Sequence, residues 1–112
     1  MLDPLATNLE RYMDLLSARQ KLVVSNIANA DTPGYRTRDI DFQTELRTAI
    51  DPTHPLVSEV AGLKTKNDGN NVSIDRESRL LAENDIRFSI ASNLMRSRLK
   101  TLRMAIEEGR SG

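Results

Sequence analysis

Two long stretches of this sequence repeat apolar residues every seven positions, and this repeat constrains the fold more than any other feature. The repeat residues of the first stretch are Leu2, Leu9, Leu16, Val23 and Ala30. Those of the second stretch are Leu81, Phe88, Met95 and Leu102. A sustained seven-residue repeat predicts a helix that packs lengthwise along another helix. The sequence therefore predicts an all-α fold with two long helices packed as a helical hairpin or coiled coil.

The first helix has clear signals at both ends. Asp3 is placed to cap the free amides, and Pro4 suits the first helical position because the missing N–H has no partner there. Pro33 disfavours helical geometry in the residue before it, so the helix should end near Ala30 or Asp31.

The second helix should begin at Ser73 or Asp75. No proline or glycine occurs in residues 75–108, so nothing in that stretch interrupts a helix. Gly109 is predicted to end it, since glycine commonly follows the last helical residue.

Polar residues interrupt the repeat of the first helix at Arg19, Gln20 and Asn26. Two interpretations remain open. One is an ordinary amphipathic helix on a small core. The other is a polar step that fixes the register between two helices.

The middle of the chain reads as a turn, a short helix and a polar loop. Thr32-Pro33-Gly34-Tyr35 fits a type II turn, with glycine at the position that requires a positive φ. Asp41 is expected to cap a short helix that runs to Ile50, and residues 56–60 are a candidate strand. The loop over 51–72 is expected to stay mobile until a partner orders it.

We therefore expect a single domain with three segments. Residues 1–30 form the N-terminal inner helix. Residues 31–72 hold the turn motif, the short helix and the polar loop. Residues 73–112 form the C-terminal helix.

Composition argues against catalysis, metal binding and nucleic-acid binding. The chain has no cysteine and one histidine, His54, so a zinc site is not expected. The carboxylates of Asp39 and Asp41 lack an acid–base partner and suit turn and cap roles. The formal net charge is zero, which is unlike a nucleic-acid-binding protein. We expect no enzyme activity, no cofactor and no metal.

The N-terminus does not read as a secretory signal. It lacks a basic leader, and Asp3, Glu10 and Asp14 interrupt any apolar core. No apolar run is long enough to cross a membrane. A role outside the cytoplasm would therefore require another export route.

One ordered motif is more specific than these patterns. The run SNIANADTPGYR over residues 25–36, followed by RDIDF over 38–42, resembles the N-terminal signature of flagellar rod and hook proteins. Within that group the chain is most similar to proximal rod proteins. Residues 68–72 and 75–77 resemble the family more loosely, and the loop is short even for a proximal rod protein.

The resemblance implies a structural protein of the bacterial flagellum. Its terminal helices would line a tubular axial assembly that serves as drive shaft and export channel. Its partners would be copies of itself, other rod and axial proteins, and ring and export-gate proteins at the rod base. The resemblance also implies a periplasmic rod location and type III export without a cleaved signal peptide. The alternative is a cytoplasmic helical adaptor or chaperone that binds partner helices.

The family motif is carried position by position onto this chain. The matching residues are Asn26, Ala28, Asn29, Thr32, Pro33, Gly34 and Tyr35. By resemblance they shape an elbow between the inner helix and the outer connector. Two hypotheses follow from their position: the asparagines hydrogen-bond across subunits, and Tyr35 packs against an adjacent subunit.

Overall fold

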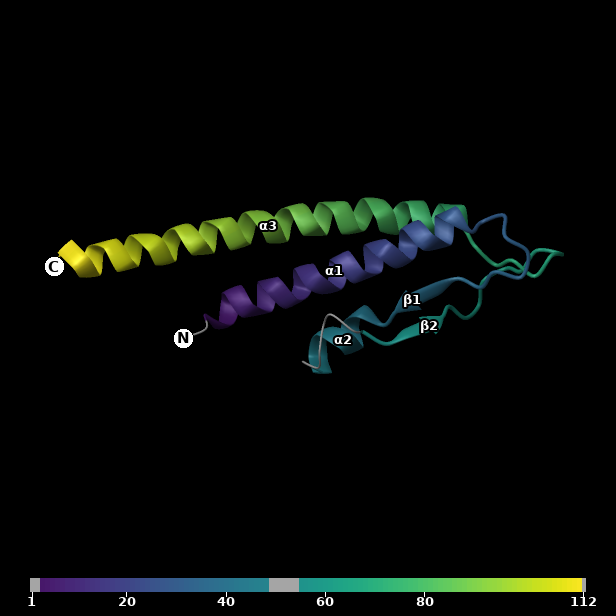
Figure 1. The fold of residues 1–112 in the computed structure, drawn as a ribbon, viewed down its shortest axis with the longest axis horizontal. Coiled ribbons are helices and arrows are strands. Elements are labelled where there is room, and N and C mark those ends of the chain that lie inside the picture. Colours follow the sequence, from purple (N-terminus) through teal and green to yellow (C-terminus); the bar gives the residue numbers. More distant parts are fainter. Residues whose placement is uncertain (1–2, 49–54, 112) are drawn as a thin grey trace.

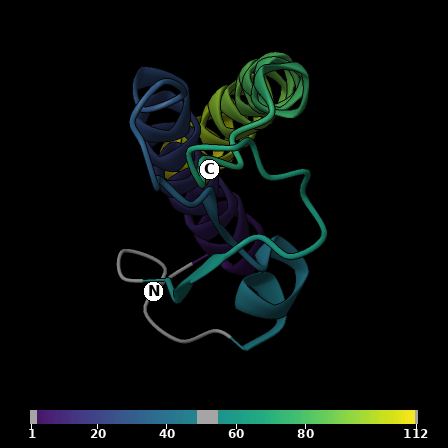
Figure 2. The same cartoon turned by 90° about the vertical axis from the view of Figure 1, so that its right-hand side faces the viewer.

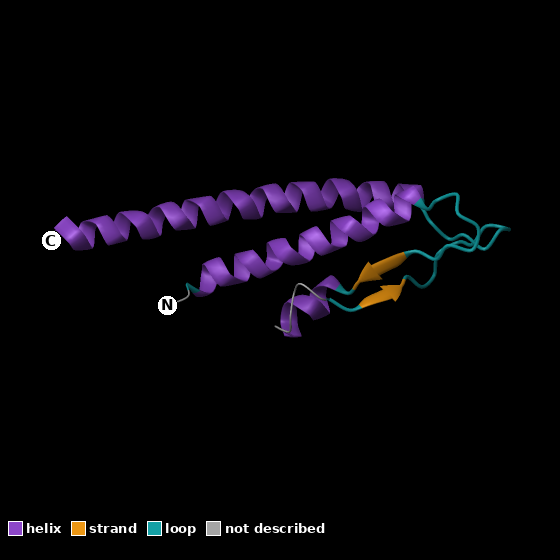
Figure 3. Ribbon diagram, in the orientation of Figure 1, coloured by secondary structure: helices purple, strands orange, loops and turns teal. Residues whose placement is uncertain are grey.

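The computed structural model describes residues 3–48 and 55–111 of the chain. The molecule is a rod of 71 × 24 × 17 Å (Figure 1). Helix α1 spans Pro4–Ala28 and helix α3 spans Ile74–Ser111, and the two lie side by side in antiparallel directions. The predicted all-α helical hairpin is therefore confirmed, with a small two-stranded sheet added to it (Figure 3).

The start of α1 differs from the prediction in one respect. Pro4 is the first helical residue, and the Asp3 carbonyl oxygen accepts the Thr7 N–H at 2.9 Å. The Asp3 carboxylate, however, makes no side-chain hydrogen bond that caps α1. Its main partner is Arg98 of α3, from which it accepts two hydrogen bonds at 2.6 and 3.0 Å. The backbone amides of Leu5 and Ala6 lower its pKa to a smaller extent, so capping is secondary to the ion pair.

The end of α1 comes slightly earlier than predicted. The helix ends at Ala28, and the Asn29 N–H reaches back to the carbonyl oxygens of Ser25 and Asn26 at 3.1 and 3.2 Å. Asn29 leaves the helical region, with φ −104° and ψ 17°. The chain therefore turns away before it reaches Pro33.

A two-stranded sheet, called the hairpin from here on, and a short helix follow the turn. Strand β1 spans Arg38–Ile40 and pairs antiparallel with strand β2, Val57–Glu59. The predicted strand is confirmed in its central residues, whereas its partner β1 is not among the predicted elements. Each strand is short, so the all-α class still describes most of the chain.

Helix α2 spans Phe42–Thr48. The Asp41 carboxylate accepts the Thr44 N–H at 3.3 Å and the Thr44 hydroxyl at 2.8 Å, which confirms the predicted cap. The predicted continuation to Ile50 lies outside the described residues.

One apolar cluster lies between α1, β1 and α2, and buried apolar residues outside it are Val23 of α1 and Leu80 and Ala91 of α3. Leu15 and Leu16 of α1 form one buried cluster with Ile40 of β1 and Phe42 of α2. The ring of Tyr12 meets the ring of Phe42 edge-on at 5.5 Å. Helix α1 is thus sandwiched, with α3 on one side and the hairpin with α2 on the other (Figure 2).

Helix α3 starts as predicted and ends later. The Ser73 hydroxyl accepts the Arg76 N–H at 3.2 Å, which caps the first turn. The helix continues through Gly109 to Ser111, so the predicted stop at Gly109 is wrong. Gly109 does not adopt the positive φ that a glycine just past a helix end usually adopts.

The repeat residues pack unequally. Leu16 and Val23 of α1 are buried, Leu9, Leu81, Met95 and Leu102 are half-buried, and Phe88 is 38% exposed. The first repeat residue, Leu2, lies outside the described residues, and Ala30 lies in the turn. The most buried side chains of α3 are Glu77, Leu80, Asn84 and Ala91. The most buried row of residues on α3 is therefore partly polar, and it lies beside the apolar row that the seven-residue repeat predicted.

The far end of α3 extends beyond α1. Arg98 contacts Asp3 at the start of α1, so residues 99–111 continue past it (Figure 1). At the usual helical rise this projecting end is roughly 20 Å long. Its apolar side chains Leu99, Met104 and Ile106 are each more than half exposed.

Candidate functional site

The segment that leaves α1, residues 29–37, is called the elbow here. The Tyr35 N–H donates to the Thr32 carbonyl at 3.2 Å, and Gly34 has φ +75°. These features confirm the predicted type II turn. The Asn29 amide donates to the Ser25 carbonyl at 2.9 Å, and its oxygen accepts the Thr32 hydroxyl at 3.0 Å.

The last part of the polar loop, residues 66–72, is called the strap and packs against the elbow. The Asn70 side chain is fully buried, and its amide donates to the Asn29 carbonyl at 2.9 Å and the Thr32 carbonyl at 2.8 Å. The expectation that a partner must order the whole loop is therefore wrong for the strap. Its order comes from contacts within the chain.

Two glycines bring the strap and the elbow close together. The Gly34 N–H donates to the Asp68 carbonyl at 2.9 Å. Gly69 has φ +88°, and a Cβ atom there would lie 3.4 Å from the Gly34 Cα. Nearby, the buried Asn71 side-chain oxygen accepts the Thr37 N–H at 2.6 Å. The elbow is thus held from both sides by backbone and amide groups.

Asn26 is the centre of the site. Only 1% of it is exposed, and its amide donates to Glu77 Oε1 at 2.6 Å and to the Arg38 carbonyl at 2.9 Å. Its oxygen accepts the Tyr35 hydroxyl at 2.9 Å and the Arg38 N–H at 3.2 Å. These four bonds use the full capacity of an asparagine side chain. The hypothesis that Asn26 bonds across subunits is therefore wrong, because its partners are in its own chain.

A chain of ion pairs extends from Asn26 to the hairpin. Glu77, whose side chain is fully buried, binds Arg76 at 2.6 Å. Arg76 also binds Asp39 of β1 at 2.7 Å, and Asp39 binds Arg19 of α1 at 3.0 Å. Two positive and two negative side chains thus alternate across α3, β1 and α1. Buried charges are tolerated only when paired in this way.

The pKa of Arg76 shows that pairing outweighs burial. Burial by itself would lower the pKa of the guanidinium, because it disfavours the charged form. The hydrogen bonds to Glu77 and Asp39 act in the opposite direction, and the net effect is a raised pKa. Arg76 therefore stays charged and links α3 to β1.

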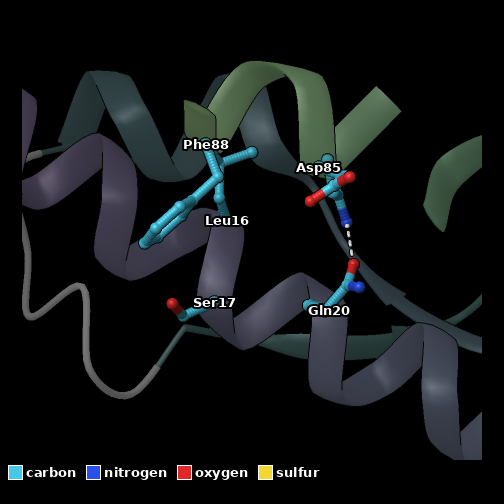
Figure 4. Close-up of a pocket in the computed structure, with 6 residues that line it drawn as sticks. Leu16, Ser17, Gln20, Asp85 and Phe88 are labelled. Carbon is cyan, nitrogen blue, oxygen red and sulfur yellow. Dashed lines mark hydrogen bonds between the residues drawn. The ribbon is translucent and has the colours of Figure 1, made fainter. Parts of the chain in front are cut away.

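A shallow groove lies between α1 and α3, lined by six residues (Figure 4). Its volume is about 250 Å³. The Asn84 amide donates to Gln20 Oε1 at 3.2 Å at one end, and Phe88 stands beside Leu16 at the other. A groove with an aromatic edge and one amide pair can contact a side chain of another molecule, and its lining also includes Ser17 and Asp85.

Nothing in the described part of the chain suggests catalysis. Residues 3–48 and 55–111 contain no group of three or more side chains suited to hold a metal ion. None of the helices described there is long and apolar enough to cross a membrane. His54 lies outside the described residues.

Comparison with known proteins identifies the family. A family model described as flagella basal body rod protein matches residues 13–36, from the middle of α1 through the turn. The chain is 31% identical over 123 positions to the flagellar basal body rod protein FlgB of Borrelia hermsii, a match covering 87% of this chain and 91% of that protein. The chain belongs to the FlgB family of flagellar basal body rod proteins. It is therefore a structural protein of the basal body and its proximal rod, and not an enzyme.

A second relative shows how this rod protein differs in length. FlgB of Escherichia coli strain K12 is 29% identical over 137 positions, covering 97% of this chain and 99% of that protein. This rod protein has 112 residues, so at least 25 of the 137 aligned positions have no counterpart in it. The difference agrees with the short loop noted in the sequence.

The family motif residues of this rod protein divide into two groups. Asn26, Asn29, Thr32 and Tyr35 make side-chain hydrogen bonds in the elbow, with Tyr35 half-buried. Pro33 and Gly34 are exposed and determine the path of the turn; Ala28 and Thr32 are also exposed.

Several residues of the site are not among the site residues predicted from the sequence, although Arg19 and Asp39 were considered for other roles and most of them lie in segments that resemble the family. These residues are Arg19, Asp39, Asn70, Asn71, Arg76, Glu77 and Asn84. The usable signal was the pair of adjacent asparagines after Asp68-Gly69, because a turn of this kind rarely needs two further amide side chains. Two buried side-chain amides of that kind indicate nearby backbone groups with which they form hydrogen bonds.

Proposed function

We propose that this rod protein self-assembles through α1 and α3 into the axial shaft and export channel of the rod. In this proposal it packs against copies of itself and other rod and axial proteins. At the base of the rod it meets ring and export-gate proteins. The elbow residues keep the two helices and the hairpin in one shape while neighbouring subunits cover the outer face of α3.

The observation that carries this proposal is the exposed apolar surface of α3. Ile86, Ile90 and Leu94 are 61%, 54% and 54% exposed. They are spaced four residues apart, so they share one face of the helix. A single chain leaves this face and the projecting end without cover, and large exposed apolar surfaces mark interaction sites.

The proposal also includes the route and the location. The rod protein would be exported without a cleaved signal peptide through the flagellar type III apparatus and would act in the periplasm. It would do so as one domain with an inner helix over 1–30, a middle segment over 31–72 and a C-terminal helix over 73–112. Supporting this division, elbow and strap together connect the two helices in the structure.

A cytoplasmic adaptor would also need an apolar helix face. Membership of the FlgB family gives an adaptor function no support, and no contact within the described residues favours that function. The two functions predict different locations for the protein. An adaptor remains in the cytosolic fraction, whereas a rod subunit copurifies with basal bodies.

The test is deletion of the gene followed by complementation and imaging of the cell envelope. We expect the deletion to abolish rods and swimming, and the wild-type chain to restore both. A chain without Thr32-Pro33-Gly34 should fail to restore them, because the elbow can no longer meet the strap. Normal rods in the deletion strain would refute the proposal.

A second pair of variants tests the α3 surface. Ile90→Ser makes an exposed apolar position polar and should reduce rod number, while the chain keeps its normal abundance. Ser89→Ala, at the neighbouring exposed residue, is the matched control and should behave as wild type. Equal rod numbers for both variants would show that this face does not pack against a neighbour.

A further inference from the structure

Within residues 3–48 and 55–111, polar side chains join α1 and its first flanking residue to α3 at three places, which we call rungs. The first bond joins two fully buried groups, the second joins two amides, and the third is a bidentate ion pair. The rungs are Asn26–Glu77 at 2.6 Å, Gln20–Asn84 at 3.2 Å, and Asp3–Arg98 at 2.6 and 3.0 Å.

The rungs lie on one row of α3. Glu77, Asn84 and Arg98 are separated by multiples of seven residues, and Ala91 fills the remaining place in the row. Their partners on α1 run in the opposite direction, as antiparallel helices require. A row with this spacing stays on one side of a helix in a packed pair.

We propose that the rungs fix the register of α1 against α3, with Glu77 as the main positioning residue. By fixing the register they also set the length of α3 that projects beyond α1. This inference goes beyond the proposed function, because it concerns the two helices of a single chain. It holds whether or not the projecting end meets a neighbouring subunit.

The apolar repeat alone does not determine the register. If α3 slides by seven residues along α1, Phe88 takes the place of Leu81, and Met95 takes the place of Phe88. Each apolar residue is replaced by another, so the apolar contacts barely discriminate between the two registers. A polar residue at a single position in the repeat does discriminate, because its partner is not repeated.

The rungs are lost in both directions of sliding. One shift brings Ala91 opposite Gln20, puts Asn84 in the place of Glu77 opposite Asn26, and moves Glu77 past the end of α1. The opposite shift brings Asn84 opposite Met13 and leaves Asn26 without a partner on α3. The first shift thus replaces the charged hydrogen bond of Asn26 by an amide pair and leaves Gln20 without its partner. The second shift buries Asn84 against Met13 without a hydrogen bond, so both shifts are unfavourable.

Glu77 also connects the register to the rest of the fold. Its second carboxylate oxygen accepts from Arg76, which binds Asp39 of β1, and Asp39 in turn binds Arg19 of α1. A shift of α3 would break two bonds of this path, Asn26–Glu77 and Arg76–Asp39. The same side chain therefore aligns α3 with α1 and with the hairpin.

Intrachain disulfides test the register directly, because the chain has no cysteine of its own. The pair Gln20→Cys with Asn84→Cys reports the observed register. The pair Gln20→Cys with Ala91→Cys reports the shifted one. Each pair is expressed in the deletion strain and oxidised, and the faster-migrating monomer band measures the intrachain bond. This readout does not depend on rod formation.

In an otherwise wild-type chain we expect the 20–84 disulfide and almost no 20–91 disulfide. Glu77→Leu should raise the ratio of 20–91 to 20–84 by about tenfold or more, because a charged hydrogen bond no longer opposes the shift. Glu77→Gln keeps an acceptor for Asn26 and should leave the ratio low. If Glu77→Leu is degraded, Asn26→Leu replaces it and removes the same rung from α1. A ratio unchanged from wild type in the leucine variant that accumulates would overturn the inference.

Discussion

Replacing Asn26 by alanine is the sharpest test of the elbow. The substitution removes four hydrogen bonds at a position that is 1% exposed. It leaves the N–H and carbonyl of Arg38 and one oxygen of Glu77 without their partner. Alanine is too small to fill the space that the asparagine side chain leaves.

The expected loss follows from the kinds of bond removed. A hydrogen bond to a charged group, here Glu77, contributes about 1.5–3 kcal/mol, and each neutral bond about 0.5–1.5 kcal/mol. Allowing for partial relaxation of the elbow, Asn26→Ala should lower the free energy of unfolding by about 3–5 kcal/mol. Small domains have only about 5–15 kcal/mol of stability, so this is a large fraction.

The assay is urea denaturation of the purified chain, followed by far-ultraviolet circular dichroism. Asn29→Ala is the matched control, because it removes an asparagine three residues later on the same helix end. The partners of Asn29 lie near solvent, so water replaces them and the loss should be about 0.5–1 kcal/mol. Equal losses for the two variants would refute the argument that the buried network holds the elbow.

Three further substitutions test other parts of the fold. The hydroxyl of Thr37 is buried and makes no hydrogen bond, so Thr37→Val should be neutral or stabilising by about 0.5–1 kcal/mol in the same urea assay. Leu16→Ala should destabilise by about 2–5 kcal/mol, since Leu16 is 1% exposed in the core; a loss below 1 kcal/mol would contradict that placement. The hydrogen bond from Arg98 lowers the pKa of Asp3 below its ordinary 3.8, so the ion pair stabilises fully above that pH and is lost as the pH falls through the lowered pKa. The difference in thermal stability between wild type and Asp3→Asn should therefore be constant near neutral pH and disappear in strong acid.

The sequence was informative where structure depends on neighbouring residues. The seven-residue repeat predicted both long helices, and Pro33-Gly34 predicted the turn. Asp41 predicted the cap of α2, since its partner Thr44 is three residues away. Each of these signals acts over a single turn or a single helix, so it can be read without knowing the fold.

The site was harder to predict because its partners are distant in sequence. Glu77 lies 51 residues after Asn26, and no local pattern links them. The row of α3 that faces α1 was also missed, because Glu77 and Asn84 are polar and the repeat had been traced through apolar residues. Asp3 shows the same effect, since a local cap was expected and its main partner is Arg98, 95 residues away.

The distribution of these contacts along the rod has a structural consequence. Buried hydrogen bonds and ion pairs concentrate at the elbow end, whereas the ion pair of Asp3 with Arg98 lies near the other end, where α3 projects. Local stability follows the density of buried contacts, so the helix ends near Asp3 and beyond Arg98 should open more readily than the elbow. We therefore expect amide hydrogens of Arg38 and Asn71 to exchange more slowly in the isolated chain than those of residues 99–111. Slow exchange throughout α3 would show instead that the helix stays formed without a neighbouring subunit on its exposed apolar face.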